Sequence, residues 1–470
     1  MTMLDIASRV IDLVAAAKPG AQAEVVVSGG ELALTRFANS YIHQNVADAT
    51  TTVRLRLHVD GRTAAGSATI PSPSTLDDEA LGRLVARTVA AASLAPRDPQ
   101  WPGLAPAAPV DPGPPVDSAT AHAAPTERAR RIREFVAAAD GLETAGYCST
   151  QLVSVAFANS AGMAAESVTA MAAMDGIARS GSSDGLARLA SSHLGDLDGT
   201  RLGSLAAAKA RAGVAPRELP PGRYEVVLEP TAVGDLLENL ALYGFNGKAV
   251  NEGRSFVEVG AAQFDPSLSI VDDPFDPRGP GLPFDVEGTP KKRLTFVDAG
   301  TTVAVAHDRR SGAVAGVPST GHALPGAASF GAIATNLRLE PATGAEAHRP
   351  GEWGGSASGP VADASVQALV AQVERGLLVT DFWYTRVLDP RTLVVTGLTR
   401  NGVWLIEKGE IVAPVQNLRF TQSYPQALAP GSVLGVGTHT VGIPSSWGGF
   451  VYRAPALRLA SWNFTGNPSG

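Results

Sequence analysis

The stretch from Glu374 to Gln422 reads ERGLLVTDFWYTRVLDPRTLVVTGLTRNGVWLIEKGEIVAPVQNLRFTQ, and its pattern indicates a β-rich C-terminal half. Its β-branched and aromatic residues gather in short runs, a composition typical of strands. We expect strands over Val379–Tyr384, Thr392–Thr396, Val403–Ile406 and Ile411–Val415. Lys408-Gly409 supplies the turn signal of a tight hairpin between the last two strands.

The same stretch resembles the C-terminal domain of the TldD/PmbA family. Members of that family carry similar Gly-Leu-x-Val-Thr-Asp-Phe, Thr-Gly-x-x-Arg-x-Gly and Ile-Glu-x-Gly-Glu-Ile series. The matching residues here are Gly376–Phe382, Thr396–Gly402 and Ile406–Ile411. Shorter matches to family patterns occur at Thr35–Asn45, Asp60–Arg62, Asn159–Gly162, Leu219–Leu228 and Phe284–Pro290. The resemblance therefore extends over most of the chain.

The resemblance includes one chemical departure. In the catalytic TldD type, a His-Glu-x-x-x-His helix supplies two zinc ligands and a general base, because nearby histidines on a helix can share a cation while the glutamate polarises its water. The comparable stretch here runs from Asp235 to Val250 and contains no histidine; none occurs between His193 and His307. The chain is therefore similar to the TldE (PmbA) type, which resembles a peptidase without its metal centre.

The resemblance implies a fold, a partner and a reaction. The implied fold is α+β, with an N-terminal α/β region followed by a large β-rich domain that encloses a cavity. In the family, a TldD-type and a TldE-type chain assemble into a heterodimeric zinc peptidase that cleaves unfolded peptides. We therefore expect zinc in a TldD-type partner, and neither a catalytic residue nor a metal in this chain. Extended peptides would pair their backbones with a sheet edge, which tolerates nearly any sequence because all residues share main-chain hydrogen bonds.

Candidates for contacts with the peptide or the partner are Asp381, Phe382, Tyr384, Arg386, Thr396, Thr399, Arg400 and His322. The aromatic cluster Phe382-Trp383-Tyr384 could wall a peptide groove, with a place in the core as the alternative. Arg400 could bind a carboxylate of the partner bidentately, with a local structural role for its segment as the alternative. His322 follows a Ser-Thr-Gly turn whose loop is a candidate lining of the cavity, with structural support as the alternative.

Composition divides the chain into four segments. Residues 1–100 predict a first α/β subdomain, and residues 126–216 predict a second one. Between them, residues 101–125 are so rich in proline that neither helices nor strands can persist, so this segment is a surface connection. Residues 217–470 form the β-rich domain.

Within these segments, periodicity predicts the individual elements. The predicted helices lie within Met1–Pro19, Thr75–Ala92, Thr126–Ala139, Leu197–Ala212, Thr231–Tyr243 and Ser365–Arg375. The further predicted strands are Ala23–Val27, Leu32–Phe37, Thr51–Val59, Glu143–Asn159, Met163–Asp175 and Tyr224–Leu228. Thr231 is the expected N-cap of its helix.

Charge and cysteine content restrict the class of protein. A net charge of −7 argues against an electrostatic nucleic-acid binder. The sequence contains no run of eighteen apolar residues, so we do not expect a membrane span. Asp5 and Asp12 interrupt the apolar pattern that a signal peptide would need. A single cysteine, Cys148, permits no intrachain disulfide. We expect a cytoplasmic protein.

Two other classes of protein remain open. The first is a self-sufficient, homodimeric hydrolase that could use Cys148 or Ser183 as its nucleophile. Ser183 lies in Gly181–Gly185, which matches the G-x-S-x-G motif. The stretch before this motif is too short and too polar for the strand of a nucleophile elbow. The eight histidines never fall within five residues of one another, so a metal site would need distant ligands. His307-Asp308 is the nearest approach to a ligand pair and is interpreted as an exposed polar pair. The third class is a non-enzymatic peptide-binding or assembly module.

Overall fold

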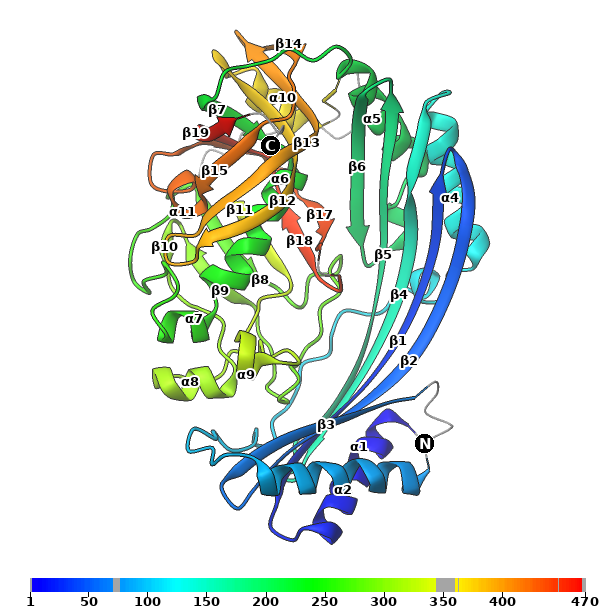
Figure 1. Ribbon diagram of the computed structural model, residues 1–470, viewed down its shortest axis with the longest axis vertical. Helices are drawn as coiled ribbons and strands as arrows, with labels where there is room; N and C mark the ends of the chain where they lie inside the picture. Colours follow the sequence, from blue (N-terminus) through cyan, green and yellow to red (C-terminus); the bar gives the residue numbers. More distant parts are fainter. Residues whose placement is uncertain (1, 71–76, 344–359, 362, 447, 467–470) are drawn as a thin grey trace.

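The computed structural model describes residues 2–70, 77–343, 360–361, 363–446 and 448–466. The N-terminal half consists of α1 (Met3–Ala17), β1 (Gln22–Ala38), β2 (Tyr41–Val59), β3 (Arg62–Ile70), α2 (Asp78–Leu94), α3 (Ser118–Ala121), α4 (Pro125–Ala138), β4 (Glu143–Asn159), β5 (Ala164–Ser180), β6 (Ser183–Ser191), the 3-10 turn η2 (Leu194–Asp196) and α5 (Gly199–Ala212). Its strands form one antiparallel six-stranded sheet in the order β3-β2-β1-β4-β5-β6. The two predicted subdomains therefore share a single sheet, which arches alongside the C-terminal domain (Figure 1).

Two hydrophobic clusters form on one face of this sheet. Helices α1 and α2 cover one end, around Val25, and helices α4 and α5 cover the other end, around Phe37. Both ends use the same face, because Val25 and Phe37 are an even number of residues apart in β1 and alternate side chains point to opposite faces. On the opposite face, Phe157 packs with Phe284, and residues near the end of β6 pack with Val451. The sheet thus lies between its helices and the C-terminal domain.

The C-terminal half is β-rich. It consists of β7 (Gly222–Leu228), α6 (Pro230–Asn239), the π-helical turn η3 (Leu240–Gly244), α7 (Gly247–Asn251), β8 (Leu268–Asp272), β9 (Leu294–Asp298), β10 (Thr301–Thr302), α8 (Arg309–Ala315), α9 (Ala327–Phe330), β11 (Leu337–Pro341), α10 (Ala364–Val370), β12 (Arg375–Asp389), β13 (Val394–Glu407), β14 (Glu410–Pro414), β15 (Arg419–Ser423), α11 (Tyr424–Ala427), β16 (Val433–Val436), β17 (Val441–Pro444), β18 (Val451–Ala454) and β19 (Leu457–Gly466). The predicted α+β class, with an N-terminal α/β region and a β-rich C-terminal domain, is confirmed.

The C-terminal strands form a barrel and an open sheet. Strands β12, β7, β19, β15 and β13 pair in that order, and β13 pairs again with β12, so the ring is closed. A second, six-stranded sheet has the order β10-β9-β8-β11-β18-β17. One hydrophobic core joins the barrel, the open sheet and α6. Phe382 belongs to this core, where its ring stacks on Trp462 with the centroids 4.9 Å apart.

Several predicted boundaries are wrong. Helix α6 begins at Pro230 with Glu229 as its N-cap rather than Thr231, because proline suits the first helical position. The predicted helix over Ser365–Arg375 ends at Val370, and Arg375 already starts β12. His307-Asp308 is buried rather than exposed; Asp308 caps α8, and its carboxylate accepts the N–H of Ser311 at 2.6 Å.

Strands are longer than their sequence runs. The predicted strands Ala23–Val27 and Leu32–Phe37 belong to one strand, β1. The predicted strands Thr392–Thr396 and Val403–Ile406 belong to one strand, β13, which begins only at Val394. In β13, Asn401 at φ 59° and Gly402 at φ 136° bend the backbone without ending the strand. Strand β6 was not predicted. Its sequence lacks β-branched residues, and Gly185 leaves room for α5, since a Cβ there would lie 2.1 Å from the Ala206 carbonyl oxygen.

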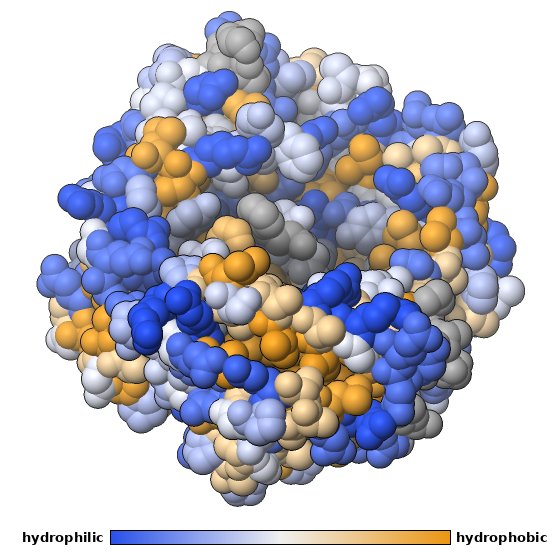
Figure 2. Space-filling model, turned by 60° about the horizontal axis from the view of Figure 1, so that its bottom comes forward, coloured by the Kyte–Doolittle hydropathy of each residue, from blue (hydrophilic) through white to orange (hydrophobic). Residues whose placement is uncertain are grey.

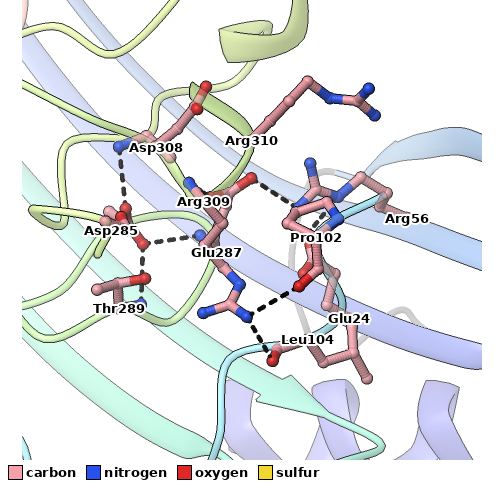
Figure 3. A network of polar contacts seen from close by, with 12 residues as sticks. Glu24, Arg56, Pro102, Leu104, Asp285, Glu287, Thr289, Asp308, Arg309 and Arg310 are labelled. Carbon is pink, nitrogen blue, oxygen red and sulfur yellow. Dashed lines mark hydrogen bonds and ion pairs between the residues drawn. The ribbon is translucent and has the colours of Figure 1, made fainter. Parts of the chain in front are cut away.

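A polar network joins the N-terminal sheet to the C-terminal domain (Figure 3). The Arg56 guanidinium, from β2, lies 2.5 Å from Glu24 of β1 and 2.8 Å from Glu287 of the loop before β9. The other oxygen of Glu287 accepts the backbone N–H of Arg309 at 2.8 Å. The Arg309 guanidinium in turn donates to the Leu104 carbonyl of the proline-rich connection at 2.8 Å. We call Glu24, Arg56, Glu287 and Arg309 the latch network.

The latch network joins three parts of the chain: the N-terminal sheet, the C-terminal domain and the proline-rich connection. Burial changes the pKa values of its carboxyl groups. Burial raises the pKa of Glu24, and the positive charge of Arg56 opposes that rise. Asp285, next to the network, is buried and accepts the N–H groups of Glu287, Thr289 and Ala323 at 2.9 to 3.0 Å. Burial and the neighbouring Glu287 raise the pKa of Asp285.

None of the helices in the described part of the chain has the length and apolar character needed to span a membrane.

Viewed with its lower end turned forward, the molecular surface is hollowed near its centre, with hydrophobic and hydrophilic side chains mixed around the hollow (Figure 2).

Candidate functional site

A cavity of about 760 Å³ lies between the N-terminal sheet and the C-terminal domain. The sheet contributes Tyr147, Asp175 and Arg188, from β4, β5 and β6. The C-terminal domain contributes residues of α6 and η3, of β12, and of β17, β18 and the loop between them. They are Thr231, Gly234, Asp235, Glu238, Asn239, Leu242, Tyr243, Asp381–Val387, Ile443–Ser446 and Tyr452. Clefts between domains are common ligand sites. We call this space the interdomain cavity.

Helix α6 presents polar side chains to the interdomain cavity and apolar ones to the core. Asp235, Glu238 and Asn239 are spaced i, i+3 and i+4, so they share one face of the helix. Leu236 and Leu237 are fully buried in the core behind them. The helix continues into the π-helical turn η3, and such turns are frequent at functional sites. In the catalytic type of the family that the sequence resembles, the stretch comparable to this helix carries histidines.

Asp235 is held by three side chains. Its carboxylate accepts the Tyr424 hydroxyl at 2.5 Å, the Thr385 hydroxyl at 2.7 Å and the Asn239 amide at 3.3 Å. Burial of the carboxylate raises the pKa of Asp235 to about 7, against the lowering effect of the two hydroxyls and with help from the negative charge of Glu238. Asp235 is therefore poised to gain or lose a proton near neutral pH.

Glu238 lies one turn further along α6. Its carboxylate accepts the hydroxyl of Ser446 at 2.8 Å and also that of Ser445, both in the loop after β17. Within the described residues, neither Glu238 nor Asp235 has a salt-bridge partner, whereas Asp175 does.

Arg188 connects the two domains across the interdomain cavity. Its guanidinium donates to Asp175 at 2.6 Å and lies 3.9 Å from the carboxylate of Asp381 in β12. Burial raises the pKa of Asp381 to about 6, although Arg188 opposes the rise. Arg188 is thus engaged by two carboxylates.

The rim of the cavity is formed by a bulge in β12. The register with β13 shifts between Trp383 and Arg386, and Tyr384 has φ 55°. Left-handed backbone is strained for an aromatic residue and is typical of functional sites. Trp383 and Tyr384 are 48% and 65% exposed, and the guanidinium groups of Arg400 and Arg386 lie over their rings, each 4.3 Å from the ring centroid.

The structure brings together part of the predicted set. Asp381, Phe382, Tyr384 and Arg386 line the cavity, and Arg400 reaches its rim through Trp383. Their contacts with a peptide or partner stay a prediction.

The other predicted residues have local partners. The Thr396 hydroxyl donates to the carbonyl of Phe420 in the neighbouring strand β15 at 2.9 Å, and the Thr399 hydroxyl accepts the N–H of Leu418, just before β15, at 2.8 Å. His322 is fully buried, 3.6 Å from Asp272, and is not among the residues that line the cavity. Burial would raise the pKa of Asp272, but the imidazole of His322 lowers it to about 2.

Sequence reasoning missed Asp235, Glu238, Arg188 and Tyr424 as members of the site. Asp235 and Glu238 could have been found, because they form the acidic stripe of an otherwise apolar helix. Arg188 and Tyr424 carry no such signal, since their roles depend on tertiary contacts.

The cavity face of α6 does not fit a zinc ion. Zinc prefers histidine, cysteine and free carboxylate ligands, whereas the carboxylates of Asp235 and Glu238 are hydrogen-bonded to the hydroxyls of Tyr424, Thr385 and two serines. In the described ranges, no group of three or more His, Cys, Asp or Glu side chains is arranged to hold a metal ion.

The two candidate nucleophiles lie outside the cavity. Cys148 is fully buried in β4, where burial raises the pKa of its thiol to about 11, so it carries little thiolate at neutral pH. Ser183 begins β6 just after the hairpin turn at Gly181 and pairs with Ser180. The strand–turn–helix context of a nucleophile elbow is therefore missing around Ser183.

A family model for the PmbA/TldA metallopeptidase C-terminal domain matches residues 221–466. The chain belongs to the PmbA/TldD family, and the resemblance seen in the sequence is confirmed. Among curated proteins, no sequence match is found.

Solved structures share the fold over the whole chain. A candidate modulator of a DNA gyrase from Thermotoga maritima has a TM-score of 0.79 at 17% identity, with 99% of this chain and 100% of that chain covered. TldE from Thermococcus kodakarensis has a TM-score of 0.79 at 16% identity, with 98% and 99% covered. A candidate modulator of DNA gyrase from Bacteroides thetaiotaomicron has a TM-score of 0.77 at 18% identity, with 98% of each chain covered.

Proposed function

We propose that this protein is the metal-free subunit of a TldD/TldE-type heterodimeric zinc peptidase in the cytoplasm. Membership of the PmbA/TldD family and the fold shared with a TldE support this assignment. The observation that carries it is the cavity face of α6, where Asp235, Glu238 and Asn239 are bonded to other side chains rather than arranged as zinc ligands. The subunit binds unfolded peptide and shapes the chamber.

In this proposal, the chain's residues position the peptide. The exposed rings of Trp383 and Tyr384 give it an apolar rim, and the cavity of about 760 Å³ accommodates a few residues of an extended chain. The closed barrel has no free edge, so backbone pairing would use β17, the outer strand of the open sheet, whose Ile443 and Pro444 reach the cavity. The partner's zinc would supply the activated water.

Co-purification of the tagged chain with cellular proteins tests the proposal. We expect a roughly equimolar partner with a His-Glu-x-x-x-His motif. Zinc quantification should find the metal in the complex and less than about a tenth of an equivalent in the isolated chain. The complex should cleave an unfolded peptide, and the isolated chain should not.

A matched control uses the same complex after metal chelation, which should abolish cleavage and leave the heterodimer intact. Cleavage by the metal-loaded chain without a partner would overturn the proposal and favour a self-sufficient hydrolase. Peptide binding without any partner in the cell would favour a non-enzymatic binding module.

A further inference from the structure

We propose that the interdomain cavity binds a positively charged group of an extended peptide, with Glu238 and Asp235 as its acceptors. The group is an organic cation, either the N-terminal ammonium or a basic side chain. This inference rests on the peptide-binding part of the proposed function and adds the class of peptide that the cavity prefers.

The charges that line the cavity are unbalanced. Its carboxylates are Asp175, Asp235, Glu238 and Asp381, and its cations are Arg188 and Arg386. Arg188 is taken up by Asp175 and Asp381. The Arg386 guanidinium lies over the ring of Tyr384 and donates to the Thr385 carbonyl at 2.7 Å. No cation within the described residues therefore neutralises Asp235 and Glu238.

Several buried acids elsewhere in the described structure are paired with a cation, whereas Asp235 and Glu238 are not. Glu24 is paired with Arg56, Glu229 lies 2.5 Å from Lys209, and Asp276 lies 3.1 Å from Arg453. Asp235 is partly buried and Glu238 is 8% exposed, yet both accept hydrogen bonds from neutral groups alone. A carboxylate held away from water without a counter-charge is unfavourable, so a cation that enters the cavity would be attracted to both carboxylates, less the cost of its own desolvation.

A second group next to Glu238 is short of a partner. Tyr452, from β18, lines the cavity and is 1% exposed. Its hydroxyl lies near Ser445 but makes no hydrogen bond of ordinary geometry. An ammonium group carries three donors and no acceptor. The carboxylate of Glu238 and the Tyr452 oxygen are acceptors of the kind that such a group needs.

The walls of the cavity suit a peptide rather than a metal ion or a small inorganic cation. Leu242, Tyr243 and Ile443 provide apolar surface beside the carboxylates, and Trp383 and Tyr384 provide aromatic faces at the rim. Aromatic faces attract organic cations and stack on side chains of an extended chain. The combination of apolar walls and unneutralised carboxylates matches a peptide with a charged end or a basic residue.

Four versions of one short unstructured peptide test the proposal by fluorescence anisotropy with the full chain. The peptide has either a free or an acetylated N-terminus, and either lysine or norleucine at one internal position. We expect the doubly neutral version to bind at least about tenfold more weakly than the doubly charged one. The two singly charged versions show whether the ammonium or the side chain supplies the cation.

Variants then locate the effect. Glu238→Gln keeps acceptors and shape, so it should fold, and we expect it to reduce the preference for charged peptide by about fivefold or more. Asp235→Asn is a second variant with the same expected direction. Glu410→Gln, on exposed β14, is the matched control and should leave the preference unchanged.

Equal affinity for charged and neutral peptides would overturn this inference and leave the peptide-binding function standing. A preference that survives in both Glu238→Gln and Asp235→Asn would also overturn it, because the cation would then bind elsewhere. Absence of binding by all four peptides would overturn both this inference and peptide binding by the chain. The heterodimer is tested separately by co-purification.

Discussion

The latch network and the interdomain cavity both hold carboxylates between the two halves of the molecule, but these carboxylates have different partners. In the latch network, Arg56 lies within 2.8 Å of both Glu24 and Glu287 (Figure 3). In the cavity, Asp235 and Glu238 accept hydroxyl groups and have no cation among the described residues. The matched region fixes the halves together, and the unmatched region keeps negative charge available for a ligand.

The largest effect should come from removing the cation of the latch network. Arg56→Met leaves the buried carboxylates of Glu24 and Glu287 without the guanidinium that pairs with both, and we expect a loss of about 3 to 5 kcal/mol in the free energy of unfolding. Urea denaturation measures the loss. Arg9→Met breaks an exposed pair with Asp78 and should change stability by less than about 1 kcal/mol.

A loss as small as that of Arg9→Met would show that Arg56 does not neutralise the carboxylates of Glu24 and Glu287. Glu24→Gln in the Arg56→Met background should recover part of the stability, because it removes one of the two uncompensated charges.

The next effect has the opposite sign and concerns Asp235. Its pKa in the folded state, about 7, lies above its ordinary value of 3.8, so the folded protein retains a proton that the unfolded chain releases. Stability contributed by this group is therefore present at acidic pH and is lost as the pH rises through about 7. Asp235→Asn should stabilise the protein at pH 8 by on the order of 2 kcal/mol and have little effect near pH 4.

Thermal or urea unfolding at the two pH values checks this prediction. Asp12→Asn, on the exposed side of α1, is the control and should show no such pH-dependent gain. Destabilisation by Asp235→Asn at pH 8 would mean that the carboxylate of Asp235 is matched after all.

The smallest effect concerns backbone strain at the cavity rim. Tyr384→Gly removes the strain of φ 55° and also a cation–π contact, so we expect stability to change by less than about 1 kcal/mol. The affinity for peptide should fall several-fold, because an exposed aromatic face is lost. Leu388→Gly, in the same strand without a left-handed backbone, should cost about 0.5 to 1 kcal/mol. Equal losses of stability in both variants would argue against strain at Tyr384.

Local patterns predicted much of the fold. The apolar spacing of α1 and α4 and the runs within β4 and β7 identified those elements, because each lies on one face or in one layer. Closure of the barrel was not predictable, since β12 pairs with β7 in parallel across more than a hundred residues of chain. Strand β6 was missed because its sequence has a low strand propensity. Gly185 within it allows the close approach of α5.

The candidate site was predicted only where the sequence signal is local. Asp381, Phe382, Tyr384 and Arg386 lie in one strand, within or just after the motif at Gly376–Phe382. Asp235 meets Tyr424 across 189 positions in the sequence. No periodicity reports a contact of that kind.

The position of β1 has a consequence for the order in which the chain folds during synthesis. β1 lies between β2 and β4, and from Glu24 to Phe37 it pairs with residues of β4. β2 follows it at once, but β4 emerges from the ribosome only after the proline-rich connection and α4. Until then one long edge of β1 is unpaired, and such edges invite pairing with other chains. Nascent chains of this protein should therefore depend on a chaperone, or on rapid translation of residues 95–143, more than its compact native sheet suggests.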